Sequence, residues 1–335
     1  ATGLGNGNLD RGQTGPSGIV RLERRGNRVL MVRDNYTARA PRGDAENQRA
    51  ASDAFPRSIV ASLPVERDTN GVITVDASSV FLGDAYGVAD GLRQGGGAGG
   101  TAAVAPGVGN YRLDVQRSYL DPERTKAFPR NVEVHAVLTF VTDQAPRGRG
   151  GVAPDARAMT FEQHHSLVVL PDTAGFRPRA YDPRFGYGGT QFFDLSKGFD
   201  GDYRGGFINR WRLVPKDPAA YARGELVEPV TPIIYYLDPG IPAPYREAFR
   251  AGGNWWSKVF EGAGFKDAFR VLDLPAGADP MDARYNMLMW VHRTGPGPSV
   301  GPSYSDPRTG EIIRAVVRMD AWRSLVDYNI WAGTV

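Results

Sequence analysis

The stretch Thr231-Pro-Ile-Ile-Tyr-Tyr-Leu-Asp238 is followed by a turn, Asp238-Pro-Gly240, and then by a long amphipathic run over residues 242–262. The first part is short, rich in β-branched and aromatic residues and closed by turn residues, so it predicts a buried strand. In the second part, apolar side chains recur at spacings of four and seven residues, at Tyr245, Phe249, Trp256 and Phe260. That spacing places them on one face of a helix, so this region predicts a helix packed on a sheet.

The paired tryptophans of this helix are expected to lie in different environments. Trp256 lies seven residues after Phe249 and four before Phe260, so it shares the predicted buried stripe. Trp255 is rotated from that stripe by about 100° around the helix axis. We therefore expect Trp256 in the core and Trp255 on the flank of the helix, facing an adjoining domain.

Composition limits the possible classes of protein. The 335 residues suffice for two or three domains, and the absence of cysteine excludes disulfides, thiolate zinc sites and a cysteine nucleophile. Net charge is only +3, from 40 basic and 37 acidic residues, and the arginines are scattered through turns. Such a distribution gives no basic surface for nucleic acid, so we expect no nucleic-acid partner. No apolar run is long enough for a membrane span, so we expect a soluble chain with no transmembrane segment.

The pattern predicts an α+β protein of three regions. Residues 1–105 form an α+β region ending in a flexible glycine-rich linker, residues 106–225 are mostly antiparallel sheet, and residues 226–335 hold the strand and helix described above. In the first region the expected elements are a glycine-rich arm over 1–18, a hairpin at Arg25-Gly-Asn27, a helix over 44–63 with a break near Pro56, a strand over 72–75, a helix over 77–93 capped by Asp76, and the linker over 94–100.

The four histidines do not form a metal motif in the sequence. They are His135, His164, His165 and His292, and no two of them are four residues apart on one helical face. His164 and His165 lie in an alternating stretch, so they point to opposite sides of a strand, one as a core imidazole and one as a surface imidazole. A shared metal there is not expected, because only a carboxylate and a histidine from a distant strand would complete it.

Several segments together resemble a family of large secreted bacterial zinc-dependent metalloproteases, in which a domain of unknown function precedes a metzincin-like catalytic domain. The resemblance covers most of residues 110–335. The segments are Thr125-Lys-Ala-Phe-Pro-Arg-Asn131, Gln163-His-His-Ser166, Arg179-Ala-Tyr-Asp-Pro-Arg184, Glu228-Pro-Val-Thr-Pro-Ile-Ile-Tyr-Tyr-Leu-Asp238, Ala278-Asp-Pro-Met-Asp-Ala-Arg-Tyr-Asn286, Trp290-Val-His-Arg293 and Ser305-Asp-Pro-Arg-Thr-Gly-Glu-Ile-Ile313.

The resemblance implies that residues 226–335 are the N-terminal, upper half of a zincin-like domain. The zinc-binding helix of such enzymes carries two histidines one turn apart with a glutamate between them, and this chain stops before it, after a segment over 322–331 that leads toward that helix. In the complete protein, a zinc-activated water deprotonated by that glutamate would attack the peptide carbonyl. This chain alone is expected to hold no catalytic residue, to bind no zinc and to be inactive.

The resemblance also implies partners and a location. The expected partners are a peptide or protein substrate, and either the missing C-terminal half or a partner subunit that covers the sheet of residues 226–335. The expected location is secreted or periplasmic, including association with the outer membrane.

Two loops are candidate sites. In zincins an edge strand above the active-site helix binds extended substrate, and the position of Ser299, Val300, Gly301, Ser303 and Tyr304 matches that strand. The same residues are equally a glycine-proline connector.

The second candidate is Phe199-Asp-Gly-Asp202, which matches a pattern found in some metzincin proenzymes, where the final aspartate blocks the zinc. These residues are more readily a loop with an Asp-Gly turn, which leaves Asp202 as a candidate zinc-blocking residue only.

An alternative from another class is a non-catalytic structural or binding subunit of a larger cell-envelope assembly, derived from such a protease. Zinc content and the mass of the native polypeptide separate the two hypotheses.

Overall fold

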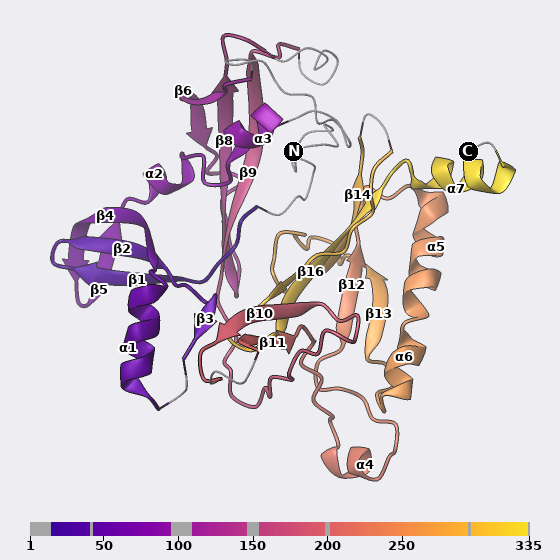
Figure 1. The fold of residues 1–335 in the computed structure, drawn as a ribbon. Coiled ribbons are helices and arrows are strands. Elements are labelled where there is room, and N and C mark those ends of the chain that lie inside the picture. The colour runs from indigo at the N-terminus through magenta and orange to yellow at the C-terminus, as the bar shows by residue number, and fades with distance from the viewer. Residues whose placement is uncertain are drawn as a thin grey trace.

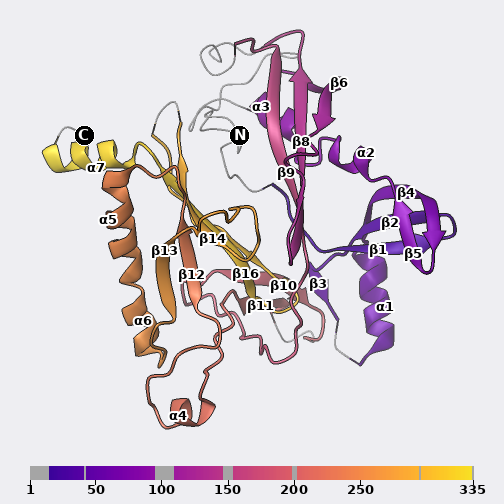
Figure 2. The ribbon, with the colours of Figure 1, turned by 180° about the vertical axis from the view of Figure 1, so that it is seen from behind.

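The structure is a computed structural model that describes residues 15–40, 43–94, 109–145, 154–197, 202–293 and 296–333. Its strands form four sheets, with helices beside the first two and against the last (Figures 1 and 2). The predicted α+β class is confirmed. The predicted arm, the linker and the boundary near residue 105 lie largely outside the described residues.

The first sheet is antiparallel and has the order β1-β2-β4-β5. The strands are β1 (Val20–Arg25), β2 (Arg28–Arg33), β4 (Ser58–Thr69) and β5 (Val72–Val75). The predicted hairpin joins β1 to β2, with Gly26 in the left-handed region that its turn requires. The helix expected over 44–63 is only α1 (Ala45–Ala54), whose first turn is capped by the Asp44 carboxylate. Residues 58–63 are strand, because Pro56 ends the helix and the β-branched Ile59 and Val60 follow it.

The single helix expected over 77–93 is two helices, α2 (Ser78–Phe81) and α3 (Val88–Gln94). Gly87 has a positive φ of 65°, which interrupts the helical path. Asp84 then caps α3, since its carboxylate accepts hydrogen bonds from the backbone N–H groups of Val88 and Ala89. Apolar side chains of both helices still pack against the second sheet: Phe81 of α2 contacts the ring of His165, and Val88 and Leu92 of α3 lie in its core.

The second sheet is antiparallel and contains the longest strand pair of the molecule. Its strands are β6 (Arg112–Leu120), β7 (Lys126–Ala127), β8 (Asn131–Val141) and β9 (Ala158–Val168), and β8 lies between β9 on one side and β6 and β7 on the other. Leu138, Phe140 and Phe161 form its core together with Leu92 of α3. The second face of β8 is buried as well, so the alternation predicted for residues 131–142 describes two buried faces.

A third, small sheet joins distant parts of the chain. Its order is β11-β10-β3, with β3 (Ala38–Arg39) parallel to β10 (Gly189–Asp194) and β10 antiparallel to β11 (Arg204–Ile208). The short helix α4 (Pro218–Ala222), capped by Asp217, follows.

The fourth sheet has five strands in the order β13-β12-β14-β16-β15. The strands are β12 (Ile233–Leu237), β13 (Phe269–Asp273), β14 (Asn286–Val291), β15 (Ser303–Ser305) and β16 (Ile312–Asp320). Four strands are parallel, and only the edge strand β15 is antiparallel to its neighbour. Helix α5 (Ala243–Asn254) packs Tyr245 and Phe249 against Trp290, as the predicted stripe requires.

The predicted burial of Trp256 is wrong. The helix breaks at the tryptophan pair, so α6 (Ser257–Gly262) is a separate element, and Trp255 and Trp256 are 74% and 57% exposed. A Cβ on Gly253 would lie 2.4 Å from the side chain of Val271, so the backbone of α5 lies directly on β13 at that point. The helix ends one residue later, at Asn254, so Trp256 does not lie on the same helical face as Phe249.

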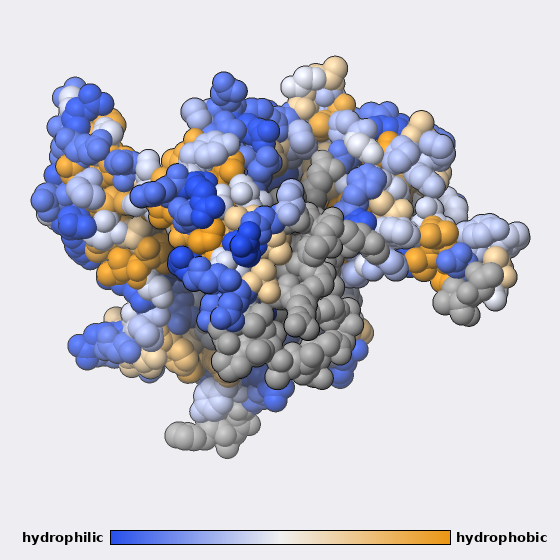
Figure 3. All heavy atoms as spheres, turned by 90° about the horizontal axis from the view of Figure 1, so that it is seen from above, coloured by the Kyte–Doolittle hydropathy of each residue, from blue (hydrophilic) through white to orange (hydrophobic). Residues whose placement is uncertain are grey.

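Helix α7 (Arg323–Ala332) extends away from the rest of the protein (Figures 1 and 3). Its large apolar side chains are mostly exposed, in particular Leu325, Tyr328, Ile330 and Trp331. No helix in the described parts of the chain is long and apolar enough to cross a membrane.

Candidate functional site

The five predicted substrate-binding residues lie along the outer edge of the fourth sheet. Val300 and Arg318 exchange two backbone hydrogen bonds, of 3.0 and 2.7 Å, and Val316 donates to the carbonyl of Pro302 at 3.1 Å. The pairing continues through β15 to Ser305, with a bulge after Tyr304. The segment is therefore an edge strand, although only residues 303–305 are regular strand.

Every second residue of this segment directs its backbone away from the sheet. In an antiparallel ladder, residues alternate between those that bond the neighbouring strand and those that do not. Val300, Pro302 and Tyr304 face β16, so the N–H and C=O groups of Gly301 and Ser303 point outward. Two outward residues at this spacing are what an added strand needs. Pro302 lies at an inward position, so its missing N–H leaves the outer edge intact.

Tyr304 turns toward the interior, where burial raises the pKa of its phenol. Its cross-strand partner is Arg314, whose guanidinium donates to the carbonyls of Tyr285 at 3.2 Å and Pro280 at 2.6 Å. Burial lowers the pKa of Arg314, while the nearby charge of Glu133 opposes this effect.

Asn131 and Glu133, at the start of β8, join the second sheet to the fourth. The amide of Asn131 donates to the carbonyl of Met281 at 3.0 Å, and its oxygen accepts from the N–H of Ala283 at 2.9 Å. The same amide donates to the Glu133 carboxylate at 2.5 Å. Glu133 is only 1% exposed, and its burial raises the pKa of the carboxyl group. Ser166 donates to that carboxylate from β9.

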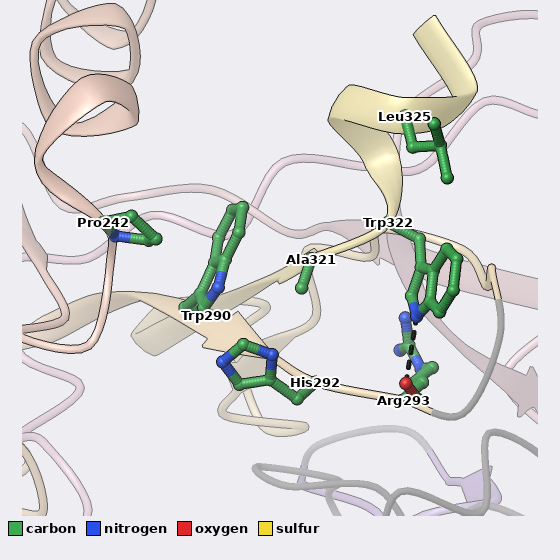
Figure 4. A pocket seen from close by; sticks show the side chains of 7 residues that line it. All are labelled: Pro242, Trp290, His292, Arg293, Ala321, Trp322 and Leu325. Atoms are coloured by element: carbon green, nitrogen blue, oxygen red, sulfur yellow. Dashed lines mark hydrogen bonds between the residues drawn. The ribbon is translucent and has the colours of Figure 1, made fainter. Parts of the chain in front are cut away.

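An open pocket of about 430 Å³ lies at the carboxyl end of the parallel strands (Figure 4). Its residues come from the start of α5, the ends of β14 and β16, and α7. They are Pro242, Trp290, His292, Arg293, Ala321, Trp322 and Leu325. Arg293 forms a buried ion pair with Asp320 at 2.8 Å, and Trp322 donates its indole N–H to the carbonyl of Arg293 at 2.9 Å.

Asp202 is an exposed turn residue. Its carboxylate accepts from the backbone N–H of Arg204 at 2.9 Å and lies 3.5 Å from the Arg204 guanidinium. Phe199, Asp200 and Gly201 lie outside the described residues. The zinc-blocking role of Asp202 stays a prediction.

The structure places the adjacent histidines as expected, with His165 buried and His164 on the opposite face of β9. It also brings His135 to His164, with ring centroids 4.3 Å apart, because the two residues are directly opposite in the β8-β9 register. Burial lowers the pKa of His165 to about 4. Across the described residues, no three His, Asp or Glu side chains are arranged to hold a metal.

One local pattern was missed in the sequence although it is legible there. Five Asp-x-Arg triplets form the same turn, in which the carboxylate accepts the backbone N–H of the arginine and binds its guanidinium. They begin at Asp155, Asp182, Asp202, Asp282 and Asp306. Three lie in the segments that carry the protease resemblance, and the triplet Asp306-Pro-Arg308 holds the turn between β15 and β16.

The fold and the site define a mixed α+β protein whose last sheet has an open antiparallel edge beside a pocket. Residues 12–216 match the family described as Domain of unknown function (DUF5117), and the chain belongs to that family. The match ends before the fourth sheet begins and covers most of the two regions predicted over 1–105 and 106–225. Comparison with curated proteins gives no match, and neither does comparison with solved structures.

Proposed function

We propose that this chain is the N-terminal part of a secreted or periplasmic zinc-dependent metalloendopeptidase, and that it supplies the edge on which an extended peptide lies. The observation that carries the proposal is the outward-facing backbone of Gly301 and Ser303 on an antiparallel strand at the edge of a parallel sheet. A peptide that adds there gains main-chain hydrogen bonds with little dependence on its sequence.

The arrangement of the fourth sheet supports the resemblance to a zincin upper half. The sheet is mixed, its one antiparallel strand lies at an edge, and α5 covers β12, β13 and β14 on one face. The edge strand is also short and bulged, which limits pairing with copies of the same chain. An edge of this kind suits a transient peptide ligand.

Zinc chemistry is not assigned to residues of this chain. A zinc protease site needs three protein ligands beside a water, and the described residues contain no such group. None of these side chains therefore takes a chemical step in hydrolysis. The zinc and the general base belong to a further part of the parent protein.

Peptide binding to this chain tests the edge. We expect extended octapeptides to bind it, and Ser303→Pro to weaken binding at least tenfold by removing an outward N–H. Ser303→Ala is the matched control, since it removes the hydroxyl but keeps the backbone donor, and it should bind as the wild type does. Equal affinities of the two variants would contradict the proposed edge site.

Zinc content and peptide cleavage of the parent protein distinguish a protease from a non-catalytic binding subunit. A protease should hold about one zinc per chain and cleave peptides, with loss of cleavage on chelation. The alternative, a binding subunit of a cell-envelope assembly, is favoured by the exposed apolar side chains of α7 and the exposed Trp255. It predicts a parent protein without zinc or cleavage.

A further inference from the structure

The pocket lies where the order of the parallel strands reverses. The chain leaves β12 through α5 to reach β13 on one side, and later enters β14 on the other side of β12. In open parallel sheets, ligands bind in the crevice outside the carboxyl ends of the strands at such a point. Pro242 follows β12, while His292 and Arg293 follow β14, so the pocket occupies this crevice.

Two indoles form fixed walls of the pocket, with a small residue between them (Figure 4). Trp290 is stacked on Tyr245, with ring centroids 5.5 Å apart, and packs edge-on against Phe249. Trp322 is fixed by its hydrogen bond to the carbonyl of Arg293. Ala321 lies between the two indoles and leaves the space open. Such walls favour a flat ring, since aromatic pairs are stabilised by stacked and edge-on contacts.

The charges near the pocket do not favour an ionic ligand. The side chains of Arg293 and Asp320 are 2% and 1% exposed and neutralise each other across 2.8 Å. His292 is the exposed polar group of the lining, and its ring makes no hydrogen bond to any described residue. The pocket therefore combines aromatic walls with one free hydrogen-bonding group, which suits an uncharged aromatic ring that carries a hydroxyl or N–H.

Asp320 connects this pocket to the start of the edge segment. The backbone N–H of Gly297 donates to its carboxylate at 2.8 Å, and its own N–H donates to the hydroxyl of Ser299 at 3.0 Å. The same carboxylate fixes Arg293 in the pocket lining. A peptide that runs antiparallel to residues 299–305 has its C-terminal end at this side of the sheet.

We propose that the pocket binds an aromatic side chain with a polar group, of the tyrosine or tryptophan type, from a peptide that lies on the edge segment. The ring lies between Trp290 and Trp322 and its polar group bonds His292. This rests on the proposed function, because it names the class of peptide that the edge selects. The ring-binding step itself requires only the pocket.

Ring binding is tested first, with p-cresol, toluene and 4-methylcyclohexanol as probes in calorimetric titrations of the whole chain. We expect saturable p-cresol binding, several-fold tighter than that of 4-methylcyclohexanol. Ala321→Leu fills the space and should weaken p-cresol binding at least tenfold. His292→Leu should lower the affinity ratio of p-cresol to toluene at least threefold. Leu325→Trp is a second filling variant, used if Ala321→Leu does not fold.

The proposal is overturned if p-cresol does not saturate the protein, or if both filling variants bind it as the wild type does. Equal affinity for p-cresol and 4-methylcyclohexanol would also overturn it, because the indole walls would then confer no preference for aromatic rings.

Octapeptides with and without one tyrosine then identify the source of the ring. We expect the tyrosine peptide to bind at least tenfold more tightly than the peptide without it, and Ala321→Leu to abolish the difference. Ser303→Pro should weaken both peptides while leaving p-cresol binding unchanged. If p-cresol binds but tyrosine adds nothing to a peptide, the pocket serves a free aromatic compound and the peptide assignment is wrong. If neither peptide binds although p-cresol does, the edge function fails and the ring site stands.

Discussion

The side chain of Asn131 should contribute strongly to holding the second and fourth sheets together. It is almost fully buried and bonds three groups, namely the carbonyl of Met281, the N–H of Ala283 and the carboxylate of Glu133. Asn131→Ala removes all three bonds and leaves the partners unpaired, two of them at the buried residues Ala283 and Glu133. The variant therefore tests whether the contact between the sheets depends on this polar network.

The expected loss in the free energy of unfolding follows from the number of polar groups that lose their hydrogen-bond partner. A buried polar group left without its partner costs about 1–3 kcal/mol, and a hydrogen bond to a charged group contributes about 1.5–3 kcal/mol. With relaxation of the loop around residue 281, the expected loss in the free energy of unfolding is about 3–6 kcal/mol. Whole domains are stable by only about 5–15 kcal/mol, so this loss is a large share.

Chemical denaturation followed by tryptophan fluorescence measures this loss. Lys126→Ala is the matched control, because Lys126 joins the same regions through a half-exposed ion pair with Asp279 at 2.6 Å. Exposed ion pairs contribute at most about 1 kcal/mol, so this control should change the midpoint little. A loss at Asn131→Ala no larger than that at Lys126→Ala would refute the argument.

Three further outcomes are expected. Burial lowers the pKa of His165 from 6.5 to about 4, so the neutral imidazole stabilises the fold above pH 6.5. This contribution, about 3 kcal/mol, is lost as the pH falls from 6.5 to 4. Unfolding curves of His165→Phe should therefore depend less on pH over that range than those of the wild type. Trp256→Ala should cost less than about 1 kcal/mol because the side chain is exposed, whereas Trp290→Ala should cost about 3–5 kcal/mol; a larger midpoint shift at Trp256 would show that its exposure is misjudged. The isolated segment 226–335 should lack a cooperative thermal transition, since its sheet relies on contacts such as that of Glu311 with Arg212; a sharp transition in calorimetry would contradict this.

The first strand of the fourth sheet was predictable because its sequence is a short run of β-branched and aromatic residues closed by a turn. The run at Ile233–Leu237 and the stripe of Tyr245 and Phe249 correspond to β12 and the buried face of α5. The periodicity of the sequence predicted the wrong environment for Trp256, because it assumes one straight helix. It cannot show that the backbone at Gly253 lies against β13.

Contacts between distant segments were not predictable from local pattern. The pairing of β3 with β10 joins residues about 150 positions apart, and no periodicity in either strand indicates it. The bonds of Asn131 to the loop at Met281 are equally distant. The pocket was missed for the same reason, since its walls come from three connections that meet only when the sheet forms.

The five Asp-x-Arg turns have a consequence for the rate of folding. Each turn closes within three residues, so it forms at a much smaller entropic cost than the pairing of distant strands. Chains rich in such local contacts fold faster than chains that depend on distant ones. We expect the turn at Asp306-Pro-Arg308 to be present transiently before β15 meets β16, which places the two strands in register early. We therefore expect the arginines at these turns to influence the order of folding events as well as the final structure.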